Sequence, residues 1–269
     1  SHLILLVKDN KGYENLMKIV SEAFTKGFYQ KPRTDKETLE KYSEGLIALS
    51  GCLSGLIPKN VLNGDLAGAK ENALFFKRIF GADNFYLELQ RHGIADQTVV
   101  NNALISLSSE LDIPLVATND VHYIGKSDST LQRLLMAIQM GKTLDESGYG
   151  LEGDQFYLKS TEEMRSLFAD VPQAVENTEK IADRCNFDFD FETMHLPAFI
   201  PPKPYTPYEY LRKLCYDGYQ EKVKSGFIKP GEEYEKRLEY ELSVIHKMGF
   251  VDYYLIVWDF VHFAKKRKI

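Results

Sequence analysis

The stretch LVATNDVHY, residues 115–123, begins as an apolar strand and ends at an acid and an imidazole. Its first four residues form the short apolar run that is typical of a buried strand. Asp120 and His122 follow two residues apart, so in an extended segment their side chains point to the same face, about 6.5–7 Å apart. This pair can hold one metal ion or two adjacent ones. The alternative is an ordinary polar loop in which Asp120 caps the segment that follows.

Two earlier apolar runs end in the same way. GLIALS (45–50) is followed by Cys52, and NFYLELQ (84–90) is followed by His92. Helical periodicity lies between the runs, at residues 65–80 and 97–111. Strands that alternate with helices of 10–15 residues indicate βαβ units and a parallel sheet or barrel. We therefore predict an α/β fold for this half of the chain.

Further elements flank these units. The sequence predicts a strand at 2–7, a helix capped by Asn10, and a short helix that a Thr34–Glu37 capping box opens. After residue 125 we expect mainly helices, at 128–139, 161–168 and 172–185, with a Ser160–Glu163 capping box and one possible strand at 155–159.

The last quarter of the chain has a different character. Residues 196–210 contain five of the ten prolines and predict an inter-domain linker that ends in a Thr206–Glu209 capping box. Amphipathic helices are expected at 207–224 and 231–248, and the final segment, 251–266, is apolar nearly all round and is expected to be buried. We therefore expect one domain at 1–195 and the start of a second at 196–269.

Composition excludes several classes of protein. The 269 residues are 44% hydrophobic and 27% charged, with a net charge of −6, so no global positive field attracts DNA or a membrane surface. The basic cluster AKKRK (264–268) is a solvated helix end or a local nucleic-acid contact. Three cysteines without a C-x-x-C pair argue against a disulfide framework, and no signal peptide or membrane span is evident. A cytoplasmic protein is expected, and the missing initial Met suggests part of a longer chain.

The candidate site consists of Cys52, His92, Asp120 and His122. Carboxyl ends of neighbouring parallel strands lie together, so these four residues are expected to converge there. A thiolate, two imidazoles and a carboxylate suit zinc, with iron or manganese as alternatives. Each residue can instead have a purely structural role. Cys52 can be a small core residue, and His92 can be a loop histidine. The other histidines (His2, His195, His246 and His262) are assigned no chemistry.

The stretches ALSGCLSG, NFYLELQRHG and IPLVATNDVHY together resemble the PHP (polymerase and histidinol phosphatase) domain of the bacterial DNA polymerase III alpha subunit. HLILLVKDNKGYENLMKIVS, QFYLKS and VENTEKIADRCN are similar to other stretches of that family. RLEYELSVIHKMGFVDYYLIVWDFVHFAK (237–265) resembles the opening of its polymerase palm. The resemblance covers essentially the whole chain.

The resemblance implies a partial, distorted α/β barrel followed by a largely helical segment that opens a palm domain. By motif match the metal ligands are Cys52, His92, Asp120 and His122. The implied activity is metal-dependent 3′–5′ exonuclease action in the intact subunit, which is a DNA-directed DNA polymerase. Implied partners are DNA, deoxynucleoside triphosphates, a sliding clamp and a proofreading exonuclease, with no membrane.

One departure from the family pattern is important. The family's N-terminal His-x-His motif has no counterpart before Ser1, and the polymerase aspartates, with their magnesium, lie beyond Ile269. We therefore expect this chain alone to be inactive. Two alternatives stay open: a non-catalytic PHP module that stabilises the polymerase and docks a proofreading subunit, and a free-standing PHP phosphatase, against which the palm-like tail argues.

Overall fold

The computed structural model describes residues 1–146, 150–193 and 196–269. It divides into two compact units, Ser1–Asp188 (unit 1) and Phe189–Ile269 (unit 2), which are considered separately. Residue 195, where we placed the end of the first domain, lies outside the described residues. Unit 1 is a mixed α/β structure, as the sequence predicts, and unit 2 is built from helices.

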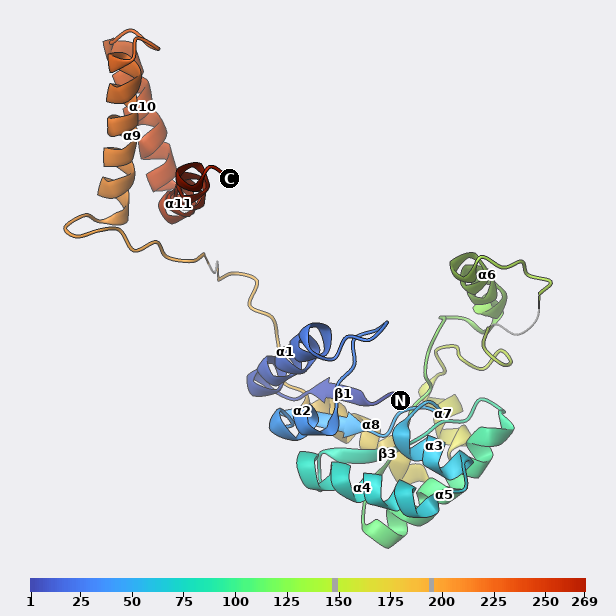
Figure 1. Ribbon diagram of the computed structural model, residues 1–269. Coiled ribbons are helices and arrows are strands. Elements are labelled where there is room, and N and C mark those ends of the chain that lie inside the picture. Colours follow the sequence, from blue (N-terminus) through green and yellow to red (C-terminus); the bar gives the residue numbers. More distant parts are fainter. Residues whose placement is uncertain (147–149, 194–195) are drawn as a thin grey trace. The chain divides into compact units, whose positions relative to one another are not determined.

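A four-stranded sheet organises unit 1 (Figure 1). Its order is β1 (Ile4–Val7), β2 (Leu46–Leu49), β3 (Phe85–Leu89) and β4 (Leu115–Ala117). The strands β2, β3 and β4 are parallel, as expected, but β1 is antiparallel to β2. The predicted parallel sheet is confirmed for β2, β3 and β4 but does not extend to β1, which two helices connect to β2. The second helix returns the chain to the end of the sheet where β1 finishes.

The helices of unit 1 fill these connections. They are α1 (Asn10–Thr25), α2 (Lys36–Lys41), α3 (Leu56–Leu62), α4 (Leu66–Phe80), α5 (Ala95–Leu111), α6 (Ser129–Met140), α7 (Thr161–Leu167) and α8 (Pro172–Arg184), with a 3-10 turn η1 at Lys126–Asp128. Helix α3 was not predicted from the sequence. This helix is short and carries Pro58 in its first turn, where a missing N–H is tolerated but the local sequence resembles a loop.

Both faces of the sheet are covered by apolar packing. On one face, Leu87 and Leu89 belong to the main core with residues of α4 and α5. On the other face, Tyr86 and Val116 pack with Ile181 of α8. Every residue of β3 is buried, because a parallel strand in the middle of a sheet has helices on both sides. The polar strand ends are therefore held on a rigid support.

The helix caps correct two expectations. Asp9, not Asn10, caps α1 through a 2.9 Å bond from Gly12 N, and Asp35 caps α2 in place of the expected Thr34–Glu37 box. The capping boxes at Ser160–Glu163 and Thr206–Glu209 are confirmed. The possible strand at 155–159 is reduced to an isolated bridge between Tyr123 and Tyr157.

Unit 2 contains α9 (Pro207–Lys224), α10 (Glu232–Lys247) and α11 (Val251–Arg267). Its core consists of Leu211, Leu242, Val251 and Leu255. The expectation that the last segment is buried all round was wrong, since Tyr253, Phe260 and Phe263 are more than half exposed. Two neighbouring helices cover only one face of α11. Across the described part of the chain, no helix has both the length and the apolar character needed to cross a membrane.

A polar cluster at the carboxyl edge of the parallel strands

The carboxyl ends of β2, β3 and β4 lie at the same edge of the sheet, because the three strands are parallel neighbours. Cys52 follows β2, His92 follows β3, and Asp120 with His122 follows β4. The Cys52 side chain contacts His2, whereas the rings of His92 and His122 both contact Phe156. Within the described residues, no three His, Cys, Asp or Glu side chains are close enough to hold one metal ion.

A buried carboxylate, which was not predicted from the sequence as a site residue, organises this edge. Glu88 lies in β3 and is 5% exposed. Its carboxylate accepts hydrogen bonds from Gly51 N at 3.0 Å, from Gln90 Nε2 at 2.9 Å and from the Thr118 hydroxyl. Burial raises the pKa of Glu88, although all three hydrogen bonds favour the charged form. The signal was available in the sequence, as an acid inside the apolar run NFYLELQ.

Glu88 connects the ends of all three parallel strands. The Gly51 N–H belongs to the turn after β2, and the Thr118 hydroxyl follows β4. The backbone N–H of Glu88 also donates to Ser50 Oγ at 2.8 Å. Gly51 has a φ of +82°, a left-handed conformation that glycine adopts without strain. The carboxylate therefore fixes the turn that presents Cys52.

His92 is buried, at 3% exposure, with both ring nitrogens in hydrogen bonds. Its Nε2 lies 2.8 Å from the carbonyl oxygen of Asn119, and its Nδ1 lies 2.8 Å from Gln97 Nε2. Only the Nε2–H tautomer satisfies both contacts. Because Nδ1 accepts from the Gln97 amide, the ring is neutral, and burial lowers the pKa of His92 in the same sense. The ring also stacks on Phe156, with centroids 4.0 Å apart. Coordination of a metal requires His92 to release one of these partners.

Asp120 and His122 follow on the loop after β4. Asp120 has a φ of +44°, unusual for a residue with a side chain, and its carbonyl oxygen lies 2.6 Å from His122 Nδ1. The His122 ring meets Phe156 edge-on, at 5.4 Å. His122 N donates to the Phe156 carbonyl oxygen at 2.8 Å. The Phe156 ring thus contacts both the buried imidazole of His92 and the exposed imidazole of His122. The Phe156 carbonyl oxygen, which accepts from His122 N, holds the loop after β4.

Cys52 has an unexpected neighbour in His2. The Cys52 sulfur lies 3.8 Å from His2 Nδ1. A tetrahedral zinc ion that binds one sulfur and one nitrogen holds these atoms about 3.6 Å apart. The pair therefore fits two positions of a zinc site. His2 was assigned no chemistry from the sequence, because it lies at the terminus. Antiparallel pairing places the start of β1 beside the end of β2, where His2 also bridges to Gly55.

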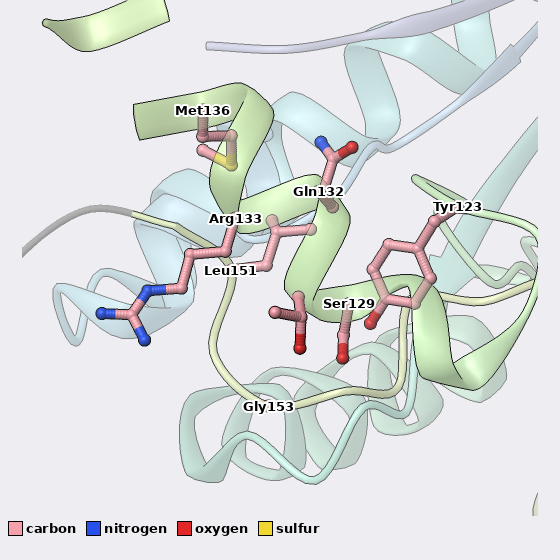
Figure 2. Close-up of a pocket in the computed structure, with 8 residues that line it drawn as sticks. Tyr123, Ser129, Gln132, Arg133, Met136, Leu151 and Gly153 are labelled. Carbon is pink, nitrogen blue, oxygen red and sulfur yellow. The ribbon is translucent and has the colours of Figure 1, made fainter. Parts of the chain in front are cut away.

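A separate pocket lies at the start of α6 (Figure 2). Figure 2 shows Tyr123 and Ser129 beside the backbone at Gly153, with Arg133 further along α6. None of the four predicted metal ligands lines this pocket. Arg133 donates to the carbonyl oxygen of Leu144 at 2.7 Å and so secures the loop after α6. The pocket therefore adds no ligand to the candidate metal site.

Comparison with known families agrees with this architecture. Residues 1–92 match the PHP domain. This range includes β1, β2 and β3 and ends at His92, one of the predicted ligands. Residues 209–269 match the family described as the bacterial DNA polymerase III alpha NTPase domain. The match to the PHP domain therefore lies in unit 1, and the match to the DNA polymerase III alpha family lies in the helices of unit 2.

The whole chain aligns with DNA polymerase III alpha subunits. It is 48% identical over 271 residues to that of Borreliella burgdorferi and 42% identical over 270 residues to that of Treponema pallidum. The subunit of Aquifex aeolicus is 43% identical over 279 residues. The chain covers all of its own length in these alignments but only about a quarter of each relative. The chain is thus similar over its whole length to a segment of each of these DNA polymerase III alpha subunits, and the resemblance found in the sequence is confirmed.

Proposed function

We propose that unit 1 supplies part of a metal-dependent phosphoesterase site that removes nucleotides from the 3′ end of DNA in the intact subunit. The approach of Cys52 and His2 to 3.8 Å, at the same sheet edge as the other predicted ligands, is the observation that supports this proposal most directly. Cys52, His92, Asp120 and His122 are the proposed ligands, and His2 is a fifth. Their donor set favours zinc, with manganese or iron as alternatives.

When bound, the metal would activate a water molecule and stabilise negative charge on the phosphoryl oxygens. The chain's own residues position the ligands. Glu88 fixes the turn before Cys52, and Phe156 holds His122 in place. The neutral His92 is able to coordinate through a ring nitrogen without first losing a proton.

For the intact subunit we propose DNA-directed DNA polymerase activity in the cytoplasm, with DNA and deoxynucleoside triphosphates as its ligands. Magnesium is the metal that we propose for the polymerase site. A sliding clamp and a proofreading exonuclease are the proposed protein partners. These proposals rest on the alignment of the whole chain with DNA polymerase III alpha subunits.

A structural role for the PHP domain is the second candidate. The observation that favours it is the hydrogen bonding of His92, since both ring nitrogens are already satisfied by protein groups. In that case the cluster would stabilise the polymerase and dock a proofreading subunit without binding metal.

Metal analysis of the full-length subunit distinguishes the two candidates. After dialysis against dilute chelator, we expect retained zinc, manganese or iron, and its loss in Cys52→Ala and His2→Ala variants. His92→Ala and Asp120→Ala should abolish metal-dependent digestion of 3′ ends while polymerisation persists. His246→Ala, in α10, is the matched control and should keep both metal and nuclease activity. Metal-free wild-type protein would support the structural role instead.

A further inference from the structure

The loop between α1 and α2 carries a local positive charge on an acidic chain. Residues 26–34, with the sequence KGFYQKPRT, contain three basic side chains and no acidic one, whereas the whole chain has a net charge of −6. Lys26 pairs with Glu22, so Lys31 and Arg33 carry the charge of the loop. Phe28 and Tyr29 lie in the same loop and are 58% and 66% exposed. We refer to residues 26–34 as the aromatic–basic loop. In Figure 1 it extends beyond the end of α1.

The loop has a defined shape. Tyr29 and Lys31 form an isolated β-bridge around Gln30, whose φ is +59°. The Arg33 guanidinium lies over the Tyr29 ring, 5.0 Å from its centroid. Phe28 stacks on Phe24 of α1, with centroids 6.4 Å apart. The aromatic rings are therefore exposed on a structured turn, which reduces the entropy lost when a ligand stacks on them.

The loop lines a pocket together with His2, the proposed fifth ligand. This pocket, of about 740 Å³, is lined by Lys31 and Arg33 of the loop and by His2 and residues of β1. His2 in turn lies 3.8 Å from the Cys52 sulfur. Among the described residues, neither Lys31 nor Arg33 forms an ion pair with a carboxylate. Both cations are thus available to an anionic ligand.

We propose that the aromatic–basic loop and this pocket bind the single-stranded 3′-terminal segment of the DNA and direct it to the site at His2 and Cys52, an inference that rests on the proposed nuclease function. Lys31 and Arg33 contact backbone phosphates, and Phe28 and Tyr29 stack with bases. Exposed rings beside unpaired cations are the combination that binds single strands without sequence preference. A duplex is disfavoured, because paired bases do not present free faces to the rings.

Photo-crosslinking on the full-length subunit tests the proposal. An oligonucleotide with 5-iodo-deoxyuridine near its 3′ end is irradiated with the protein in EDTA, so that no metal-dependent chemistry occurs. We expect crosslinked peptides from residues 24–33, and loss of most of this product in Tyr29→Ala. The double variant Lys31→Ala/Arg33→Ala should also lose it. The control Lys70→Ala/Lys180→Ala removes the same charge from α4 and α8 and should crosslink like the wild type.

Nuclease kinetics give a second readout. Lys31→Ala/Arg33→Ala should raise KM for single-stranded DNA with kcat unchanged, and the salt dependence of log KM should become less steep by about 1.4, or 0.7 per lost phosphate contact. Lys31→Arg/Arg33→Lys should restore KM. Crosslinking at the loop in a protein without nuclease activity would refute the proposed function but keep this inference. An active nuclease with no crosslink at the loop, and with unchanged KM in the double variant, would overturn the inference.

Discussion

Replacement of Glu88 by methionine tests the carboxylate that connects the three parallel strand ends. Methionine has a similar length and fits a buried position, but it accepts no strong hydrogen bonds. The variant leaves the Gly51 N–H and one Gln90 N–H without their acceptor. A buried donor that loses its partner costs about 1–3 kcal/mol. Because the variant also avoids burying a carboxyl group, we expect a net loss of about 2–4 kcal/mol in the free energy of unfolding.

Glu88→Gln is the matched control. It keeps the shape and one acceptor oxygen, but its amide N–H₂ must face at least one of the donors that Glu88 now accepts from. The expected loss is therefore smaller, about 1–2 kcal/mol. A larger loss of unfolding free energy for Glu88→Met than for Glu88→Gln is specific to a hydrogen-bonding role of Glu88.

Urea denaturation of the 269-residue chain, followed by circular dichroism, measures both losses. The single tryptophan, Trp258, lies in α11 of unit 2, so its fluorescence follows unit 2 separately. We expect the Glu88 variants to lower the midpoint of the transition of unit 1 and to leave the Trp258 transition nearly unchanged. A Glu88→Met protein as stable as the wild type would refute the reasoning, because desolvation of the carboxyl group would then cancel its hydrogen bonds.

The pH dependence gives an independent check. Burial raises the pKa of Glu88 above its ordinary value of 4.5, so the folded state binds this proton more tightly than the unfolded state does. The stability that Glu88 adds is then fully present below about pH 4.5 and is lost as the pH rises through the raised pKa. The stability difference between wild type and Glu88→Gln should therefore shrink with rising pH. A difference that grows with pH would contradict a raised pKa.

Two further predictions concern other parts of unit 1. Arg91 donates to both carboxylate oxygens of Asp170, at 2.6 and 2.8 Å. A double-mutant cycle with Arg91→Ala and Asp170→Ala should give a coupling free energy of only about 0.5–1 kcal/mol, because Asp170 is largely exposed. A coupling above about 2 kcal/mol would show that solvent screens this pair less than its exposure implies. Gly12→Ala would place a Cβ 1.9 Å from the Gly45 carbonyl oxygen and should cost about 2–4 kcal/mol in thermal or urea unfolding. The control is Gly218→Ala in α9, where nothing lies within 4 Å of the added Cβ. This variant should raise the free energy of unfolding by about 0.5–1 kcal/mol. Equal effects at both glycines would be inconsistent with the close approach at Gly12.

Local patterns predicted most of the secondary structure of this chain. The apolar runs that became β2, β3 and β4 were readable because each is short, buried on both faces and followed by polar residues. The boxes at Ser160 and Thr206 were readable because a capping box is a contact within four residues. At Asn10 and Thr34 the same reasoning chose the wrong residue, since an adjacent aspartate competes for the same backbone N–H groups.

The sequence by itself determined which residues end the parallel strands, and therefore that Cys52, His92, Asp120 and His122 come to one edge of the sheet. This follows from alternating strands and helices, which are encoded locally. Only the tertiary structure decided which groups meet there. The antiparallel pairing of β1 brings His2 to Cys52, and the packing of Phe156 separates His92 from His122. The burial of Glu88, which shifts its pKa, likewise depends on strand ends far away in the sequence, at Gly51 and Thr118, because desolvation is set by the whole surrounding fold.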